Sequence, residues 1–196
     1  MSERPPPAAL APPTAMPKPD LIGERVVLRA ITTADLDGGW LDWMNDAAVT
    51  RHLATPGPLT ADDLAAYLAA SAWPSAAMFA VCDRETGVHI GNARLSAFDW
   101  ANHRCTFGWI LGHPDYRGRG LGAEALALLL RYGFAQLGLH RIYSGIHADN
   151  EPSLRSARRV GMVQEGVQRD GALCEGQFVD VVDVAMLHAE FEAGHS

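Results

Sequence analysis

The chain of 196 residues has the length of one domain of ordinary size. Its 48% hydrophobic and 20% charged residues exclude wholesale disorder, collagen-like repeats and low-complexity fibres. The net charge of −7 disfavours nonspecific attraction to nucleic acid or to an anionic membrane, so we expect neither as a partner.

The N-terminal segment differs in composition from the rest of the chain. Seven of the 12 prolines lie in the first 19 residues, and proline interrupts both helices and β-ladders. We therefore predict a disordered or extended Pro-rich tail over residues 1–20 and a single domain over residues 21–196. The tail lacks the pattern of a secretory signal, and no apolar run approaches the ~20 residues of a membrane span, so we expect a soluble, cytoplasmic protein.

The three cysteines, Cys82, Cys105 and Cys174, are an odd number at wide spacing. Neither a disulfide framework nor a zinc site follows from this pattern, so we expect reduced thiols and no metal. No cysteine accompanies a nearby histidine in a recognisable nucleophile arrangement, which argues against a covalent intermediate on cysteine.

The first half of the domain contains the patterns of a strand, two helices and three further strands. Thr32 or Thr33 can cap the first helix, and Thr60 followed by Asp63 resembles the capping box that begins the second. Strand-forming runs joined by short turns follow. We predict a strand at 26–30, a helix from 32 or 33 to about 43, a helix from 60, and an antiparallel meander of strands at 78–82, 89–98 and 104–111.

Residues 120–137 give the strongest helical signal of the chain. Apolar side chains lie on nearly all sides of this segment, and Gly138 can end the helix. We expect it to be a buried central helix. The remaining predicted elements are a strand at 142–146, a helix from 152 to about 160 and closing strands at 163–167 and 178–187, which together give an α+β domain on a mixed sheet.

The segment RGRGLG, residues 117–122, lies between a predicted strand and the N-terminus of the central helix. The first backbone N–H groups of a helix have no partner within it, and glycines without a Cβ let an anion approach them closely. Arg117 and Arg119 add positive charge at the same place, although the chain as a whole is acidic. A diphosphate is the ligand that fits this combination.

Other interpretations of the glycine-rich segment are less well supported. A P-loop is excluded because the pattern GxxxxGK[ST] is absent and the single lysine, Lys18, lies in the tail. Gly118, Gly120 and Ala123 match a loose GxGxxA dinucleotide pattern, but the acidic residue that should follow about 20 positions later is missing. A turn that only reverses the chain remains an alternative.

At this point the sequence resembles a known family. RGRGLG is similar to RxxGxG/A, the acetyl-coenzyme A pyrophosphate loop of the GNAT superfamily of N-acetyltransferases. The segments NEPS at 150–153 and RVGM at 159–162 resemble the NxxS and KxGF motifs of that family, and IGNA at 90–93 with GW at 108–109 matches its preceding strands. The similarity extends from residue 21 to about residue 187, on the branch of ribosomal-protein N-terminal, polyamine and amino-sugar acetyltransferases.

The resemblance implies a GNAT-like, mostly antiparallel mixed sheet of about seven strands, with a central helix after the loop and helices on both faces. It implies transfer of an acetyl group from acetyl-coenzyme A (acetyl-CoA) to a primary amine by direct attack in a ternary complex, without a metal.

The implied catalytic residues are Leu111, whose N–H would bind the developing oxyanion, and Ser153, which would protonate the departing thiolate. The implied cofactor-binding residues are Trp109, Leu111, Arg117, Gly118, Arg119, Gly120, Leu121, Gly122, Ala123, Asn150 and Ser153. Asn150 in an Asx turn and Ser153 bonded to backbone are the ordinary alternatives.

One position departs from the family pattern. Many relatives carry a glutamate two residues ahead of the Gly-aromatic pair, where this chain has Thr106. A catalytically silent acyl-CoA-binding module is therefore the alternative function. Attack by an amine with a pKa of about 10 needs a proton acceptor or a water chain. The substitutes are Asp99, His103, His147, Asp170 and Glu175, each of which is also an ordinary solvated loop residue.

The acceptor is the least determined part of the interpretation. Residues 40–46, WLDWMND, resemble a WLND segment that helps to wall the acceptor groove in this superfamily, although tryptophans there can equally belong to the core. A peptide N-terminus, an antibiotic, a polyamine and an amino sugar all remain open. A homodimer would follow the habit of the family.

Overall fold

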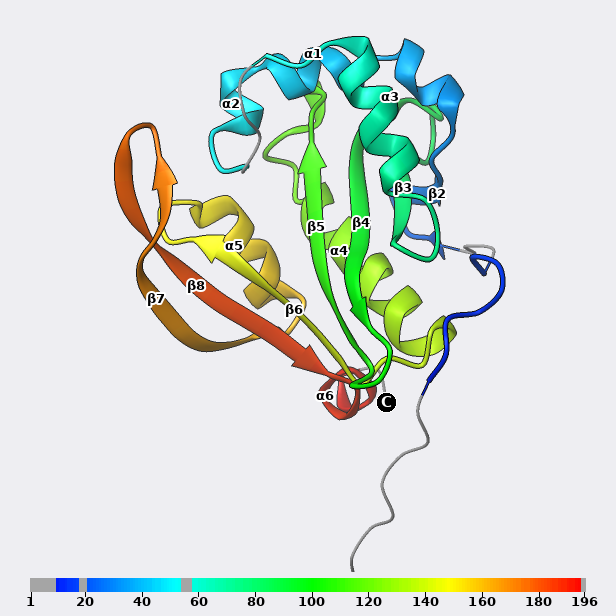
Figure 1. The fold of residues 1–196 in the computed structure, drawn as a ribbon, viewed down its shortest axis with the longest axis vertical. Coiled ribbons are helices and arrows are strands. Elements are labelled where there is room, and N and C mark those ends of the chain that lie inside the picture. The colour runs from blue at the N-terminus through cyan, green and yellow to red at the C-terminus, as the bar shows by residue number, and fades with distance from the viewer. Residues whose placement is uncertain (1–9, 18–20, 54–57, 195–196) are drawn as a thin grey trace, which may run out of the picture.

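The computed structural model describes residues 10–17, 21–53 and 58–194, and one eight-stranded sheet organises them (Figure 1). The strand order is β1-β2-β3-β4-β5-β6-β8-β7, and every neighbouring pair is antiparallel except the parallel pair β5–β6. The strands are β1 Leu21–Ile22, β2 Val26–Ala30, β3 Ala76–Asp83, β4 His89–Asp99, β5 Arg104–Leu111, β6 Arg141–His147, β7 Val163–Cys174 and β8 Gln177–Leu187. The predicted mixed, mostly antiparallel α+β fold is confirmed, with eight strands rather than about seven.

The helices form two groups around this sheet. Figure 1 shows α1, α2 and α3 gathered at one end of the sheet, whereas α4 crosses strands β4 and β5. The helical elements are a 3-10 turn Thr33–Asp37, α1 Trp40–Asn45, α2 Ala47–Thr50, α3 Ala61–Ala70, a 3-10 turn Pro114–Tyr116, α4 Leu121–Arg131, α5 Glu151–Arg159 and α6 His188–Ala193. Helix α4 continues into one wider π-helical turn, Tyr132–Gln136.

The first predicted helix is wrong as a single element. Thr32 caps a short 3-10 turn through Asp35, but the chain leaves helical geometry at Gly38, and α1 begins only after Gly39. Two consecutive glycines carry a high entropic cost in a helix and therefore separate the two pieces. The capping box at Thr60 is present as predicted, since the Thr60 N–H donates to Asp63 Oδ2 at 2.8 Å and α3 follows.

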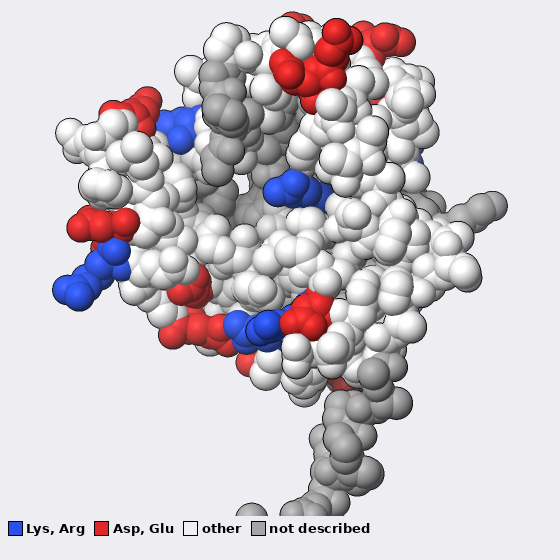
Figure 2. Space-filling view, in the orientation of Figure 1, with Lys and Arg blue, Asp and Glu red and all other residues white. Residues whose placement is uncertain are grey.

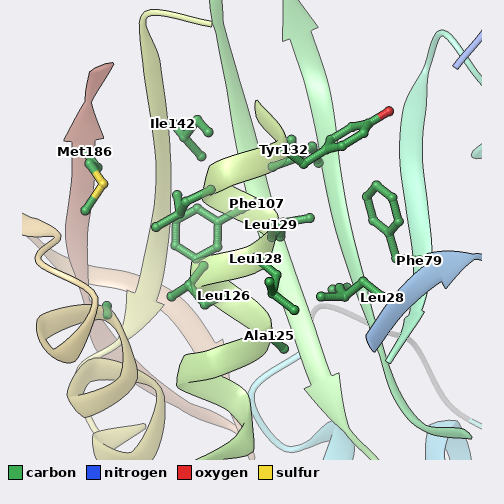
Figure 3. Close-up of a cluster of buried hydrophobic side chains, with 14 of the residues drawn as sticks. Leu28, Phe79, Phe107, Ala125, Leu126, Leu128, Leu129, Tyr132, Ile142 and Met186 are labelled. Atoms are coloured by element: carbon green, nitrogen blue, oxygen red, sulfur yellow. The ribbon is translucent and has the colours of Figure 1, made fainter. Parts of the chain in front are cut away.

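Helix α4 is the centre of the core. Leu126 and Leu129 are fully buried, and Figure 3 shows their helix between Phe79 of β3 on one side and Ile142 of β6 on the other. Burying a leucine side chain contributes about 1.5–3 kcal/mol, so this helix fixes the two halves of the sheet against each other. Its N-terminus is thereby held in one place.

Strands β5 and β6 pair over only part of their length. The parallel register runs from Arg104 opposite Arg141 to Thr106 opposite Tyr143 and stops there. In Figure 1 the two strands meet near α6 and diverge toward α1 and α2. The last five residues of β5, 107–111, therefore have a free backbone edge on the side away from β4.

The described part of the N-terminal tail lies against the domain without forming a helix or strand. Trp73 Nε1 donates to the carbonyl oxygen of Pro13 at 2.8 Å, and the Tyr132 hydroxyl donates to that of Pro17 at 3.0 Å. The remainder of the predicted tail, residues 1–9 and 18–20, lies outside the described residues. Among the described residues, no helix has the length and apolarity needed to cross a membrane.

Candidate active site

The glycine-rich loop enters α4 in left-handed backbone geometry. Gly118 has φ 74° and Gly120 has φ 77°, a region that glycine adopts without steric cost. Gly120 is the N-cap residue of α4, and no side chain caps the helix. Among the described residues, the backbone N–H groups of residues 118–123 make no hydrogen bond to the protein. These donors are therefore available to a ligand.

Arg25 holds this loop from the opposite side. Its Nη1 donates to the carbonyl oxygen of Arg119 at 3.0 Å, and its Nε pairs with Glu124 at 3.0 Å. A trans peptide directs its C=O and N–H in opposite directions. Because the Arg119 carbonyl points to Arg25, the N–H of Gly120 points away from Arg25.

A cavity of about 880 Å³ lies in front of the loop, and we call it the glycine-loop cleft. It is bounded by the loop itself, by the end of β5 and by the first turns of α5. The residues predicted for the cofactor that line it are Trp109, Leu111, Arg117, Gly118, Gly120, Gly122, Ala123, Asn150 and Ser153. Leu121 is buried in the core, and neither it nor Arg119 is among the residues that line the cleft.

The two arginines of the loop lie in different surroundings. Arg117 lines the cleft, and its Nη2 pairs with Asp46 at 3.0 Å and donates to the Gly112 carbonyl, so its charge is partly offset. Arg119 does not line the cleft, and its guanidinium carbon lies 5.5 Å from the centre of the Tyr116 ring.

Helix α5 supplies cationic side chains that the sequence analysis missed. Arg155, Arg158 and Arg159 all line the glycine-loop cleft. Arg155 and Arg158 share Glu151 at 3.7 and 3.2 Å. A Cβ added to Gly120 would lie 3.3 Å from Arg159 Nη1, which shows how close this guanidinium is to the loop. These arginines recur at helical spacing after Pro152, and this spacing could have predicted a basic face on the helix.

Asn150 and Ser153 occupy the first turn of α5 at the cleft. The Asn150 side chain caps the helix by accepting from the Ser153 N–H at 3.3 Å. The Asx-type role of Asn150 is therefore present, together with a position on the cleft wall. Ser153 takes part in the cap through its backbone N–H, which leaves its hydroxyl out of the cap.

The end of β5 presents backbone donors to the gap between β5 and β6. The Gly112 N–H donates to the Ile90 carbonyl of β4 at 3.0 Å. Successive N–H groups along a strand alternate in direction. The N–H groups of Trp109 and Leu111 therefore point away from β4, toward the free edge of β5.

A second cavity, of about 400 Å³, lies on the other side of Trp109, and we call it the aromatic pocket. Trp40 and Met44 of α1 form one wall, so the predicted acceptor-groove segment does reach a cavity. Trp43 instead packs in the core, where a Cβ on Gly112 would fall 2.0 Å from its ring. Figure 2 shows that this face of the molecule is hollowed, with acidic side chains mainly around its periphery.

The two cavities meet at three residues. Leu53, Trp109 and Ile110 line both the glycine-loop cleft and the aromatic pocket. Trp109 and Ile110 lie where β5 has left β6, so one ligand in each cavity would come together at this free edge. This is the arrangement that a transfer reaction between two substrates requires.

The comparison with known families agrees with this architecture. A family model described as an acetyltransferase (GNAT) domain matches residues 25–163. The chain belongs to the GNAT family of acetyltransferases. It is therefore an enzyme of the N-acetyltransferase class.

Individual relatives of this GNAT acetyltransferase support the assignment. The uncharacterized N-acetyltransferase p20 of Bacillus licheniformis is 29% identical over 175 residues, which are 87% of this chain and 97% of that protein. A spermidine N(1)-acetyltransferase of Escherichia coli is 27% identical over 114 residues, 58% of this chain and 59% of that protein. A similar fold is found in the structure of a spermidine N-acetyltransferase from Vibrio cholerae in complex with CoA and spermine. The two structures superpose with a TM-score of 0.79 at 22% sequence identity, over 87% of this chain and 99% of that chain, which supports the fold.

A polar cluster lies beside the cleft where the chain after α2 meets the chain after β6, and its member His52 lines the cleft. His52 Nε2 lies 3.2 Å from Asp149 Oδ1, and Arg51 Nη2 lies 3.2 Å from the other carboxylate oxygen. Partial burial opposes ionisation of Asp149, but His52 and Arg51 outweigh it and hold the pKa of its carboxyl below the usual range. The ring of His147 meets that of His52 edge-on at 5.6 Å. Because His52 lines the cleft, it is a candidate proton acceptor that the sequence did not reveal.

Cys174 lies near a histidine that is distant in the sequence. Its Sγ lies with a ring nitrogen of His52 and a carboxylate oxygen of Asp149, all within 4.8 Å of one another. This spacing also suits a metal ion, although Arg51 already offsets the charge of Asp149. The thiol donates to the Arg51 carbonyl at 3.3 Å, and Cys174 is not among the described residues that line either cavity.

The other residues considered as proton acceptors do not line either cavity, although Glu175 pairs with Arg51 of the His52 cluster at 3.3 Å. Thr106, at the position where relatives often carry glutamate, donates its hydroxyl to the Ser96 carbonyl at 3.1 Å. His147 lies next to His52, as described above. The remaining predicted bases, Asp99, His103, Asp170 and Glu175, are not among the described residues that line the cleft or the aromatic pocket.

Proposed function

We propose that this enzyme transfers the acetyl group of acetyl-CoA to a primary amine by direct attack in a ternary complex. The observation that carries the proposal is the meeting of two cavities at Leu53, Trp109 and Ile110. One cavity is bounded by free helix N-terminal amides, and the other is mainly apolar. A ternary complex needs both substrates bound at once with their reacting atoms in contact.

The glycine-loop cleft suits coenzyme A through its own residues. The amides of residues 118–123 would bind the diphosphate, with Arg159 adding charge beside Gly120. Asn150 would hold the pantetheine arm along the free edge of β5. The N–H groups of Trp109 and Leu111 would stabilise negative charge on the thioester oxygen, and the Ser153 hydroxyl would protonate the departing thiolate.

His52, with Asp149 behind it, would accept a proton from the substrate ammonium, which leaves the neutral amine that attacks the thioester. The carboxylate 3.2 Å from the ring nitrogen would stabilise the imidazolium that forms. This pair would take over the role of the glutamate that is missing at Thr106. It therefore favours an active transferase over a silent acyl-CoA-binding module.

The experiment that tests the proposal measures thiol release from acetyl-CoA with a panel of primary amines, together with isothermal titration of acetyl-CoA. We expect micromolar-range binding, amine-dependent release of CoA and intersecting double-reciprocal lines. Binding of acetyl-CoA without turnover of any amine would select the silent module. Parallel lines would indicate a covalent intermediate and contradict direct attack.

A further inference from the structure

The aromatic pocket contains two charged residues, and they lie in very different surroundings. Its walls are apolar or aromatic, and among its lining residues Asp63 is the acid and Arg94 the base. Asp63 Oδ2 accepts from both the N–H and the hydroxyl of Thr60, at 2.8 and 2.6 Å. One oxygen of its carboxylate therefore takes part in the capping box that begins α3.

Arg94 is not committed to an acid in the same way. Its Nη1 donates to the Tyr67 hydroxyl at 2.5 Å, and its guanidinium carbon lies 5.8 Å from the centre of the Tyr67 ring. Among the described residues, no carboxylate pairs with Arg94, whereas Arg104 on the neighbouring strand pairs with Asp99. The remaining guanidinium donors are free for a planar anionic group. Figure 2 shows basic surface within the hollow of this face.

This charge pattern is the reverse of what a polyamine needs. A polyamine presents further ammonium groups beyond the one that reacts, and a carboxylate attracts such a group most strongly. The aromatic pocket offers one carboxylate, of which one oxygen is engaged in a helix cap, and a guanidinium that repels a second cation.

We propose that the acceptor is a primary amine with an apolar or aromatic body and a carboxylate, and that Arg94 binds the carboxylate. This inference rests on the proposed acetyl transfer. Arg94 lies opposite Gly108 in the β4–β5 register, two residues before Ile110, where the cavities meet. Two residues of a strand span about 7 Å, so the amine and the carboxylate should be separated roughly as two groups are on opposite sides of a para-substituted benzene ring.

A matched pair of amines tests this inference. 4-(Aminomethyl)benzoate and benzylamine differ only in the carboxylate, which lies across the ring from the amine, and spermidine represents the polyamines. For the wild type we expect kcat/KM to be at least about tenfold higher for 4-(aminomethyl)benzoate than for benzylamine, with spermidine the poorest of the three. Equal or better use of benzylamine or spermidine would overturn the inference.

The variant Arg94→Gln should lower the ratio of kcat/KM for 4-(aminomethyl)benzoate to kcat/KM for benzylamine about tenfold, mainly through KM of the carboxylate-bearing amine. Arg94→Lys keeps the charge but loses the planar fork, so its ratio should be intermediate. Arg104→Gln, on the same sheet but outside both cavities, is the control and should leave the ratio at the wild-type value. A ratio that Arg94→Gln does not change contradicts the assignment.

The outcomes separate this inference from the proposed function. Turnover of all amines without preference for a carboxylate leaves acetyl transfer standing and rejects the acceptor class. Absence of both acetyl-CoA binding and turnover rejects both. If acetyl-CoA binds without turnover, titration of 4-(aminomethyl)benzoate into the CoA-saturated protein tests whether Arg94 binds the carboxylate. Failure of this amine to bind, or equal affinity in the wild type and in Arg94→Gln, rejects that role.

Discussion

The glycine-loop cleft and the aromatic pocket lie on either side of Trp109, yet they are built from different kinds of groups. The loop side of the cleft consists of backbone N–H groups, ordered by two left-handed glycines and by Arg25. The aromatic pocket consists of side chains from α1, α3, β3, β4 and β5. A backbone site presents the same donors whatever the neighbouring side chains are, so it suits an invariant cosubstrate. A side-chain site can change its ligand through single substitutions, so it suits a variable acceptor.

The largest expected effect comes from filling the backbone site. Gly120→Glu places bulk and negative charge in front of the free amides, and a Cβ there meets Arg159 at 3.3 Å. We expect at least about 100-fold weaker binding of acetyl-CoA, measured by isothermal titration. Gly87→Glu is the matched control, because Gly87 has a similar φ of 72° and no atom within 4 Å of an added Cβ. Wild-type affinity in Gly120→Glu would contradict the diphosphate site.

The next largest effect should come from the proton acceptor where the two cavities approach each other. His52→Gln should lower kcat about 100-fold with little change in the binding of acetyl-CoA. Asp149→Asn should cost less, because its carboxylate acts through His52. The control is His103→Gln, since His103 accepts a hydrogen bond from the Leu10 N–H outside both cavities. Wild-type kcat in His52→Gln would exclude it as the base.

A smaller effect is expected on the stability of the layer that carries the aromatic pocket. Burial opposes ionisation of Asp35, but hydrogen bonds from Arg29 and Thr32 outweigh it and lower the pKa of Asp35 to about 2. Because the folded pKa lies below the unfolded value of about 3.9, this contribution is present above about pH 4 and is lost as the pH falls toward 2. Asp35→Asn should therefore lower the free energy of unfolding by about 1–2 kcal/mol at neutral pH and by less near pH 3.

Urea unfolding at several pH values measures this difference. Asp37→Asn, an exposed acid in the same 3-10 turn, is the control and should behave as the wild type at each pH. A constant difference between Asp35→Asn and wild type from neutral pH down to about 3 would show that the Asp35 charge is not the source of the stability.

The smallest expected effect is that of the thiol near His52. Cys174→Ser should change kcat/KM by less than about twofold, because Cys174 lines neither cavity among the described residues. Mass spectrometry of the protein incubated with acetyl-CoA and no amine should show no acetyl group on Cys174. A trapped acetyl-cysteine with lost activity in Cys174→Ser would replace direct attack by a two-step mechanism.

The contrast between the two cavities also explains what the sequence could predict. The loop, the central helix and strand β5 are specified by contiguous residues, and the predicted strand 104–111 matches β5 in full. The pair Gly38-Gly39 could have predicted the break in the first helix. The capping residues before it instead favoured one continuous helix. Strand β7 extends well beyond the predicted residue 167 because its exposed polar residues carry no hydrophobic alternation.

The candidate site was predictable only where its parts are local. The motif at 117–122 and Asn150 could be named from the sequence. The His52–Asp149 pair and the Arg94–Tyr67 pair could not, because each joins segments that are distant in the chain and adjacent only after folding. The pairing of Arg117 with Asp46 is the same kind of contact, and it partly offsets the charge that the sequence had placed in the site.

The central claim is that the free amides at the start of α4 bind the diphosphate of the cosubstrate. Titration of ¹⁵N-labelled protein with acetyl-CoA, followed by NMR, measures the binding of the cosubstrate to these amides most directly. The account predicts that the amide resonances of Gly118, Gly120 and Gly122 undergo the largest shifts, that they saturate at one equivalent, and that Gly120→Glu abolishes the response. Saturable binding that leaves these three amides unmoved while shifting others would contradict it.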